Sequence, residues 1–150
     1  MLIQTHLLPL VHKSLLLHAN TLKEQGIKQT LLLPEFDPLV EIDPRLIQQA
    51  LVHLIRNSVE AMPCGGDLCI EVVVAAEEVR IILRDSGYGL DTSRKGYATD
   101  PFYTTKMVGT GMGLTLVKRI IEDHGGSLRV DNRSEGGVRA TVVLPRGKVA

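Results

Sequence analysis

The residues best suited to chemistry are glycines that lead into a helical pattern between Met107 and Gly126. Three of them alternate in GTGMG, Gly109 to Gly113, and apolar residues at helical spacing follow. Glycines that open a helix leave backbone N–H groups bare and turn the positive end of the helix dipole toward an anion. The spacing fits neither the Walker loop, which needs G-K-[ST], nor the Rossmann fingerprint. The stretch predicts a phosphate-binding loop of another kind; the alternative is a flexible loop that only caps the helix.

A helix expected from Pro44 to about Met62 carries polar residues along the edge of its apolar side. At about 100° per residue, Asn57 falls just inside the apolar arc, with His53 four residues before it and Glu60 three after it. A helix that only packs on a core favours leucine at such positions. The stripe predicts either a binding site beside the helix or a buried asparagine whose amide is satisfied by local backbone.

An aspartate stands at the end of a strand that reads as fully buried, in DSGYG, Asp85 to Gly89. Gly87 and Gly89 free the backbone to turn, so the carboxylate is fixed where it can accept a hydrogen bond from an amino group such as that of adenine. The pattern D-x-G-x-G alone is weak, because Asp-Ser-Gly is also ordinary turn chemistry. The pattern indicates a binding site only together with the other motifs of the chain.

Helices and strands that must position these residues follow from the hydrophobic pattern. It predicts helices at 6–26, 44–62 and 111–124, and strands at 29–33, 38–42, 69–75, 79–84, 127–132 and 138–145. Asp43 is expected to cap the second helix, with Pro44 in its first turn. Residues 85–110 show no periodicity and form a loop of a length that is usually functional. We expect one domain, 1–150, with an α+β two-layer sandwich: three helices on one face of a mixed five- to six-stranded sheet.

Composition narrows the class of protein. The 17 basic and 17 acidic residues cancel without a long run of one sign, and aromatic residues are only 3%, so a nucleic-acid-binding surface is not expected. No apolar run approaches the ~20 residues that span a bilayer. Cys64 and Cys69 lack the spacing and the second pair of a zinc site, so reduced thiols are expected. We expect a soluble, cytoplasmic domain without membrane contact.

Four segments occur in one order: HLIRNSVEAM, DSGYG, DPFYTTK and GTGMGLTLVKRIIEDHGG. Together they resemble the ATP-binding catalytic domain of sensor histidine kinases, within a wider family that includes gyrase and MutL. DPFYTTK points to the kinases rather than the gyrase-like ATPases, and RNSVEAM looks most like kinases of the nitrogen-regulation type. The resemblance covers about Ile27 to Pro145 and implies the Bergerat fold, with Mg-ATP as the ligand and transfer of its γ-phosphate to a histidine as the activity.

Carried over position by position, the resemblance implies roles for individual residues. Asn57 would coordinate the Mg²⁺ that bridges the phosphates, and Asp85 would accept a hydrogen bond from the adenine amino group. Residues 91–108 would form the ATP lid. The wider set of implied nucleotide contacts comprises Gly87 and Gly89 at the base, Thr105 and Lys106 near the phosphates, and the amides of Gly109, Thr110, Gly111, Met112, Gly113 and Leu114 around them.

The resemblance also implies partners, namely a histidine on a separate dimerisation hairpin and, beyond it, a response regulator. None of His6, His12 and His18 begins the H-E-x-x-x-P pattern of that hairpin, and too few residues precede Gln29 to build it. We therefore expect the hairpin to be absent from this chain and the domain to be a monomer in isolation.

Two positions depart from the family pattern. His53 stands where relatives commonly have Asn and gyrase-like members a catalytic Glu, so strong ATP hydrolysis is not expected, although a histidine can act as a general base. Tyr88 replaces a frequent proline. Two other functions stay open: an anti-sigma-type module that binds nucleotide in order to grip a protein partner, and a nucleotide-binding relic without transfer activity.

Overall fold

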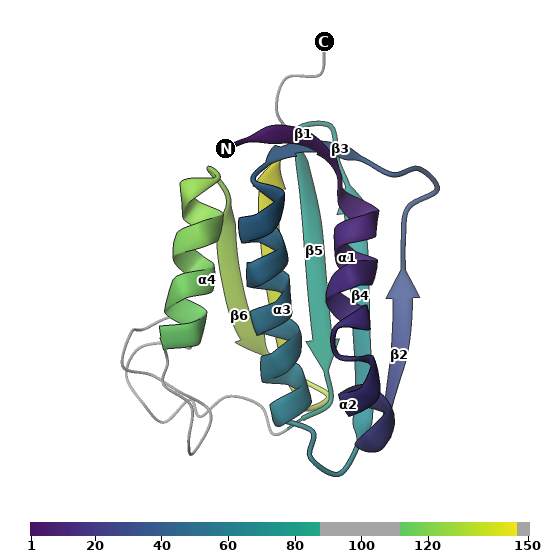
Figure 1. The fold of residues 1–150 in the computed structure, drawn as a ribbon. Helices are drawn as coiled ribbons and strands as arrows, with labels where there is room; N and C mark the ends of the chain where they lie inside the picture. Colours follow the sequence, from purple (N-terminus) through teal and green to yellow (C-terminus); the bar gives the residue numbers. More distant parts are fainter. Residues whose placement is uncertain (88–111, 147–150) are drawn as a thin grey trace.

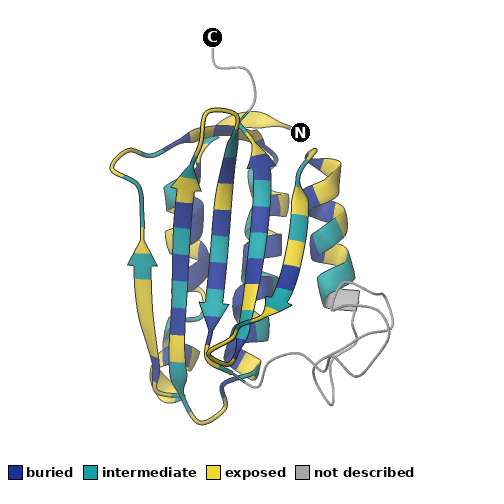
Figure 2. Ribbon diagram, turned by 180° about the vertical axis from the view of Figure 1, so that it is seen from behind, coloured by how far each residue is buried: buried dark blue, intermediate teal, exposed yellow. Residues whose placement is uncertain are grey.

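Five strands form the main sheet of the protein, in a computed structural model that describes residues 1–87 and 112–146 (Figures 1 and 2). Their order is β2-β4-β5-β7-β6. The strands are β2 (Ile27–Leu32), β4 (Gly66–Val74), β5 (Glu78–Asp85), β6 (Ser127–Asn132) and β7 (Val138–Pro145). β2 is parallel to β4 and every other pair is antiparallel, so the predicted mixed sheet is confirmed.

Helices cover one face of this sheet. Figure 1 shows the longer helices side by side in front of the strands, and Figure 2 shows the opposite face without a helix. They are α1 (Leu7–Leu16), α3 (Pro44–Glu60) and α4 (Met112–Asp123); the short α2 (Ala19–Glu24) follows α1. Alternate residues of β5, Val79, Ile81 and Leu83, are buried in the core between the two layers. The α+β two-layer class is thus confirmed.

The helix that carries Asn57 begins as the sequence predicts. The Asp43 side chain accepts hydrogen bonds from the backbone N–H groups of Arg45 and Leu46, and Pro44 occupies the first turn, where a missing N–H costs nothing. The buried residues of α3 then recur every three or four positions and face the sheet: Ile47, Ala50, Leu51, Leu54, Ile55, Ser58 and Val59.

The expected single helix over 6–26 is wrong. Residues Ile3–His6 form a strand, β1, and the helical part is divided at Leu17, where the N–H of His18 bonds to Leu15 in a tighter turn. Leucines lie on both the buried and the exposed sides of this segment, so the hydrophobic periodicity gives no sign of the break. After the break, Leu22 is buried in the core. The start of α1 is set from a distance, because its first N–H groups bond to Pro38 and to the Asp37 carboxylate.

The strand expected at 38–42 exists but lies outside the main sheet. β3 (Leu39–Ile42) pairs antiparallel with β1 instead, in a separate two-stranded sheet. Over the described ranges 1–87 and 112–146 the chain thus has four helices and seven strands, where three and about six were expected. None of the helices in those ranges is long and apolar enough to cross a bilayer.

A buried histidine joins the two long helices at the end of the molecule away from β5's last residue. His124 follows α4, and its Nε2 accepts a hydrogen bond from the N–H of Asp43, 3.0 Å away. A backbone N–H only donates, so the proton of the neutral ring is on Nδ1, which donates to the Ile120 carbonyl at 2.7 Å. The start of α3 is therefore tied to the end of α4.

Replacing His124 with Leu is expected to lower the free energy of unfolding by about 1–3 kcal/mol, because the partly buried N–H of Asp43 then lacks its acceptor. Urea denaturation of the purified domain measures this. His12→Leu, on the exposed side of α1, is the matched control and should change stability by less than about 0.5 kcal/mol. Equal losses in the two variants would contradict the role given to His124.

Candidate functional site

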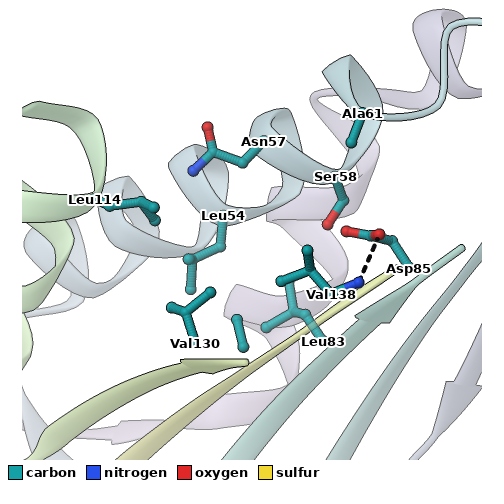
Figure 3. Close-up of a pocket in the computed structure, with 10 residues that line it drawn as sticks. Leu54, Asn57, Ser58, Ala61, Leu83, Asp85, Leu114, Val130 and Val138 are labelled. Carbon is teal, nitrogen blue, oxygen red and sulfur yellow. Dashed lines mark hydrogen bonds between the residues drawn. The ribbon is translucent and has the colours of Figure 1, made fainter. Parts of the chain in front are cut away.

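A cavity opens between α3 and the sheet, near the end of α3 and the end of β5 (Figure 3). Most of its wall is apolar, and its polar side chains come from three residues, Asn57, Ser58 and Asp85. The remaining lining residues are Leu54, Ala61, Leu83, Leu114, Val130, Val138 and Ala140. A largely apolar hollow with a few converging polar groups is the usual form of a small-molecule site.

Asp85 ends β5 and is only 3% exposed. Its Oδ1 accepts two backbone hydrogen bonds, from the N–H of Gly87 at 3.0 Å and from that of Val138 at 3.1 Å. Burying a carboxylate is costly without such partners. Figure 3 shows the Ser58 hydroxyl directed toward the same carboxylate. The group is therefore a fixed acceptor at one end of an apolar hollow.

The backbone around Asp85 is held from both neighbouring strands. On the β4 side, the N–H of Ser86 bonds to the Asp67 carbonyl, and the Ser86 hydroxyl accepts from the Asp67 N–H. On the β7 side, Arg133 donates from Nη1 to the Asp85 carbonyl at 2.7 Å. Arg133 could not be predicted from the sequence, because its partner is 48 positions away and no local pattern marks the contact.

Asn57 and Asp85 line one cavity, as expected from the sequence. Asn57 sits in the last part of α3, where the helix presents Leu54, Asn57 and Ser58 to the hollow. His53, one turn earlier, is half-buried but is not among the residues that line the cavity.

Some of the other predicted site residues lie within the described part of the chain, and others lie outside it. Leu114, in the first turns of α4, lines the cavity. Gly87 lies so close to α3 that a Cβ there would stand 2.6 Å from the Ala61 carbonyl oxygen. Met112 and Gly113 begin α4. Outside the described residues lie Gly89, Thr105, Lys106, Gly109, Thr110, Gly111 and the expected lid, 91–108.

Strands contribute an apolar wall that sequence analysis did not assign to a site. Val130, Val138 and Ala140 come from the hairpin of β6 and β7, and Leu83 comes from β5. Each lies on the helix-facing side of its strand, so alternation alone predicts a core position. Only the three-dimensional arrangement of α3, α4 and the sheet makes these core-type residues the wall of a cavity.

Comparison with known families identifies this architecture. Residues 42–148 match the family of histidine kinase-, DNA gyrase B- and HSP90-like ATPases. The chain belongs to this family. Its α+β fold and its similarity to named kinases make it a catalytic domain of the histidine kinase type.

Individual relatives agree with that assignment. The C4-dicarboxylate transport sensor protein DctS of Rhodobacter capsulatus is 39% identical over 89% of this chain and 21% of its own length. Sporulation kinase C of Bacillus subtilis is 34% identical over 71% of this chain and 25% of its own. The chain thus spans about a quarter or less of these relatives. The nitrogen-regulation subtype stays a prediction.

A solved structure supports the fold over almost the whole chain. The catalytic domain of histidine kinase ThkA superimposes with a TM-score of 0.88 at 30% identity, covering 97% of this chain and 98% of that one. The histidine kinase-like domain described here therefore resembles an isolated catalytic domain in both extent and layout.

The hairpin turn behind Asp85 offers a stability test of this ATPase-family domain. Gly137 has φ +91°, and a Cβ there would stand within 2 Å of the Asp85 carbonyl oxygen; Gly136 has φ +99° and open space around it. Gly136→Ala should lower the unfolding free energy by about 1–2 kcal/mol for its left-handed backbone alone. Gly137→Ala should lower it further, because β5 and the turn must separate. Chemical denaturation compares the two, and equal losses would contradict the close approach.

Proposed function

We propose that this chain binds Mg-ATP and donates its γ-phosphate to a histidine on a separate dimerisation hairpin. The observation that carries the proposal is the buried Asp85 carboxylate, whose Oδ1 is committed to the N–H groups of Gly87 and Val138 at one end of an apolar cavity. Such a group is oriented before any ligand arrives. Its second oxygen, toward which the Ser58 hydroxyl is directed, would accept a hydrogen bond from the ligand.

The base that suits this cavity is adenine. A carboxylate only accepts hydrogen bonds, so it matches the exocyclic amino group of adenine. A base with an oxygen at the same ring position would set an acceptor against the carboxylate, which leaves a buried polar pair unsatisfied. Leu54, Leu83 and Val130 offer apolar surface to the faces of a planar ring.

The phosphates and Mg²⁺ would be held toward the Asn57 and Leu114 side of the cavity. An amide oxygen suits Mg²⁺, which commonly takes one or two protein oxygens and completes its shell with phosphates and water. The described part of the chain has no cluster of three or more His, Cys, Asp or Glu side chains suited to a metal. A site made from Asn57 and the triphosphate itself fits that donor set.

To transfer the γ-phosphate to the acceptor histidine, the domain must mainly position the reacting groups and neutralise the phosphate charge. We propose that Thr105, Lys106 and the amides of residues 109–114 surround the phosphates at the start of α4, where the helix dipole favours anions. Bound Mg²⁺ would neutralise phosphate charge. We assign no general-base role to His53, because it does not line the cavity.

The partners follow from the same proposal. The acceptor histidine would come from a separate dimerisation hairpin, and a response regulator would take the phosphate from it. In support, a structure of histidine kinase ThkA in complex with the response regulator TrrA has a catalytic part that superimposes on this chain with a TM-score of 0.84 at 27% identity.

Asp85→Asn is expected to weaken ATP binding about 10- to 100-fold, which corresponds to losing a hydrogen bond to a charged group. The amide oxygen can still accept from Gly87 and Val138, while the NH₂ group would face the adenine amino group as donor against donor. Isothermal titration calorimetry measures the affinity. Asp67→Asn, an exposed aspartate on β4, is the control. Unchanged affinity for ATP in Asp85→Asn would refute the base-binding role.

A reconstituted transfer assay tests the activity itself. The chain is mixed with a matched histidine hairpin and γ-labelled Mg-ATP, and label on the hairpin is followed. We expect transfer by the unmodified chain and by Gln49→Ala, which removes an exposed amide from α3, but at least a tenfold slower rate for Asn57→Ala. Nucleotide binding without transfer would indicate an interaction module or a relic instead.

A further inference from the structure

We infer that Arg133 is a positioning residue for adenine recognition, acting through Asp85 without touching the base. The inference deepens the proposed function and rests on it. Arg133 lies in the turn between β6 and β7 and donates from Nη1 to the main-chain carbonyl of Asp85. It is not among the residues that line the cavity.

The geometry makes Arg133 part of a clamp on one residue. Val138, the first residue of β7 after the turn, donates its N–H to the Asp85 carboxylate at 3.1 Å, while Arg133 holds the Asp85 carbonyl at 2.7 Å. The turn and the start of β7 therefore hold both the main chain and the side chain of Asp85. If they move away, the carboxylate loses one of its two N–H donors and its orientation.

The guanidinium is itself held in place. Its Nη2 donates to Glu135 at 2.9 Å, and Glu135 also accepts a hydrogen bond from the Ser134 hydroxyl. Two hydrogen bonds lower the pKa of the exposed Glu135 carboxyl; the one from Ser134 contributes most and the one from Arg133 next. The turn closes on itself as well, since the N–H of Arg133 bonds to the Gly137 carbonyl. A planar group with donors fixed in a fork can make both contacts at once.

The turn packs closely against the end of β5. Gly137 lies against the backbone of Asp85 and Ser86, where even a methyl group would collide. The distance between turn and strand is thus set by contact. The main-chain pairing of β5 with β7 ends at Arg84 and Arg139, and Arg133 adds an attraction just beyond that end. Arg129, on β6, pairs with Asp131 and has 79% of its side chain exposed. Because β7 separates β6 from β5 in the sheet, Arg129 serves as the matched control arginine.

The test compares two ligands on three variants. ATP is compared with purine riboside triphosphate, in which hydrogen replaces the 6-amino group, so that only ATP uses the Asp85 carboxylate. The variants are Arg133→Met, which keeps an unbranched apolar stem but removes the guanidinium, Arg133→Lys, and the control Arg129→Met. Calorimetry gives both dissociation constants, and thermal melting shows that each variant is folded.

We expect the unmodified chain and Arg129→Met to prefer ATP over the analogue by about 10- to 100-fold. Arg133→Met should reduce that preference at least fivefold while its affinity for the analogue stays within twofold. Arg133→Lys should restore part of the preference, because an ammonium can still reach the carbonyl but cannot also hold Glu135. Equal weakening of both ligands, or an unchanged preference, would overturn the inference.

A measurement without ligand tests the role of Arg133 independently of ATP binding. Amide hydrogen exchange at Val138 should become at least tenfold faster in Arg133→Met than in Arg129→Met, because the turn opens from Asp85. If the unmodified chain binds no ATP, the proposed function fails, and exchange at Val138 then decides whether Arg133 holds Asp85. Unchanged exchange overturns the clamp. If Arg133→Met does not fold, Arg133→Lys is judged by the same two measurements.

Discussion

One buried carboxylate sets the constraint that the rest of the site obeys. Asp85 is only 3% exposed, and a carboxylate in such surroundings is stable only with hydrogen bonds that replace water. Both donors to its Oδ1, the N–H groups of Gly87 and Val138, belong to the main chain and cannot rotate away. The chain must therefore turn sharply after β5 and must bring the β7 hairpin alongside it. The glycines at 87 and 137 are the residues that permit each approach.

The two helices that border the site are fixed at their far ends. His124 ties the end of α4 to the N-cap of α3, whereas Asn57 and Leu114 lie toward the opposite ends of those helices, at the cavity. The two helices run antiparallel, so one end of the pair carries the His124 contact and the other end borders the cavity. The apolar floor of the cavity is the inner face of the sheet.

Sequence alone predicts those parts of the fold that depend on local pattern. β6 and β7 match their expected bounds, 127–132 and 138–145, because alternating apolar residues lie between glycine turns. The cap at Asp43 is likewise a local feature. β1 and the break at Leu17 escaped prediction, since β1 exists only by pairing with β3 some 36 residues later, and leucines on every side of the helix hide its break. Long-range contacts decide both.

The same division holds within the site. Asn57 and Asp85 are visible in the sequence because a polar side chain interrupts a helix face or ends a buried strand, which are local anomalies. Arg133 gives no such signal, since an arginine in a polar turn is ordinary until the turn is folded onto β5. Residues that touch a ligand must carry unusual chemistry, whereas residues that hold them need only the right place. A family pattern therefore points to the groups that we propose contact the nucleotide, and the structure adds the residues that hold those groups in place.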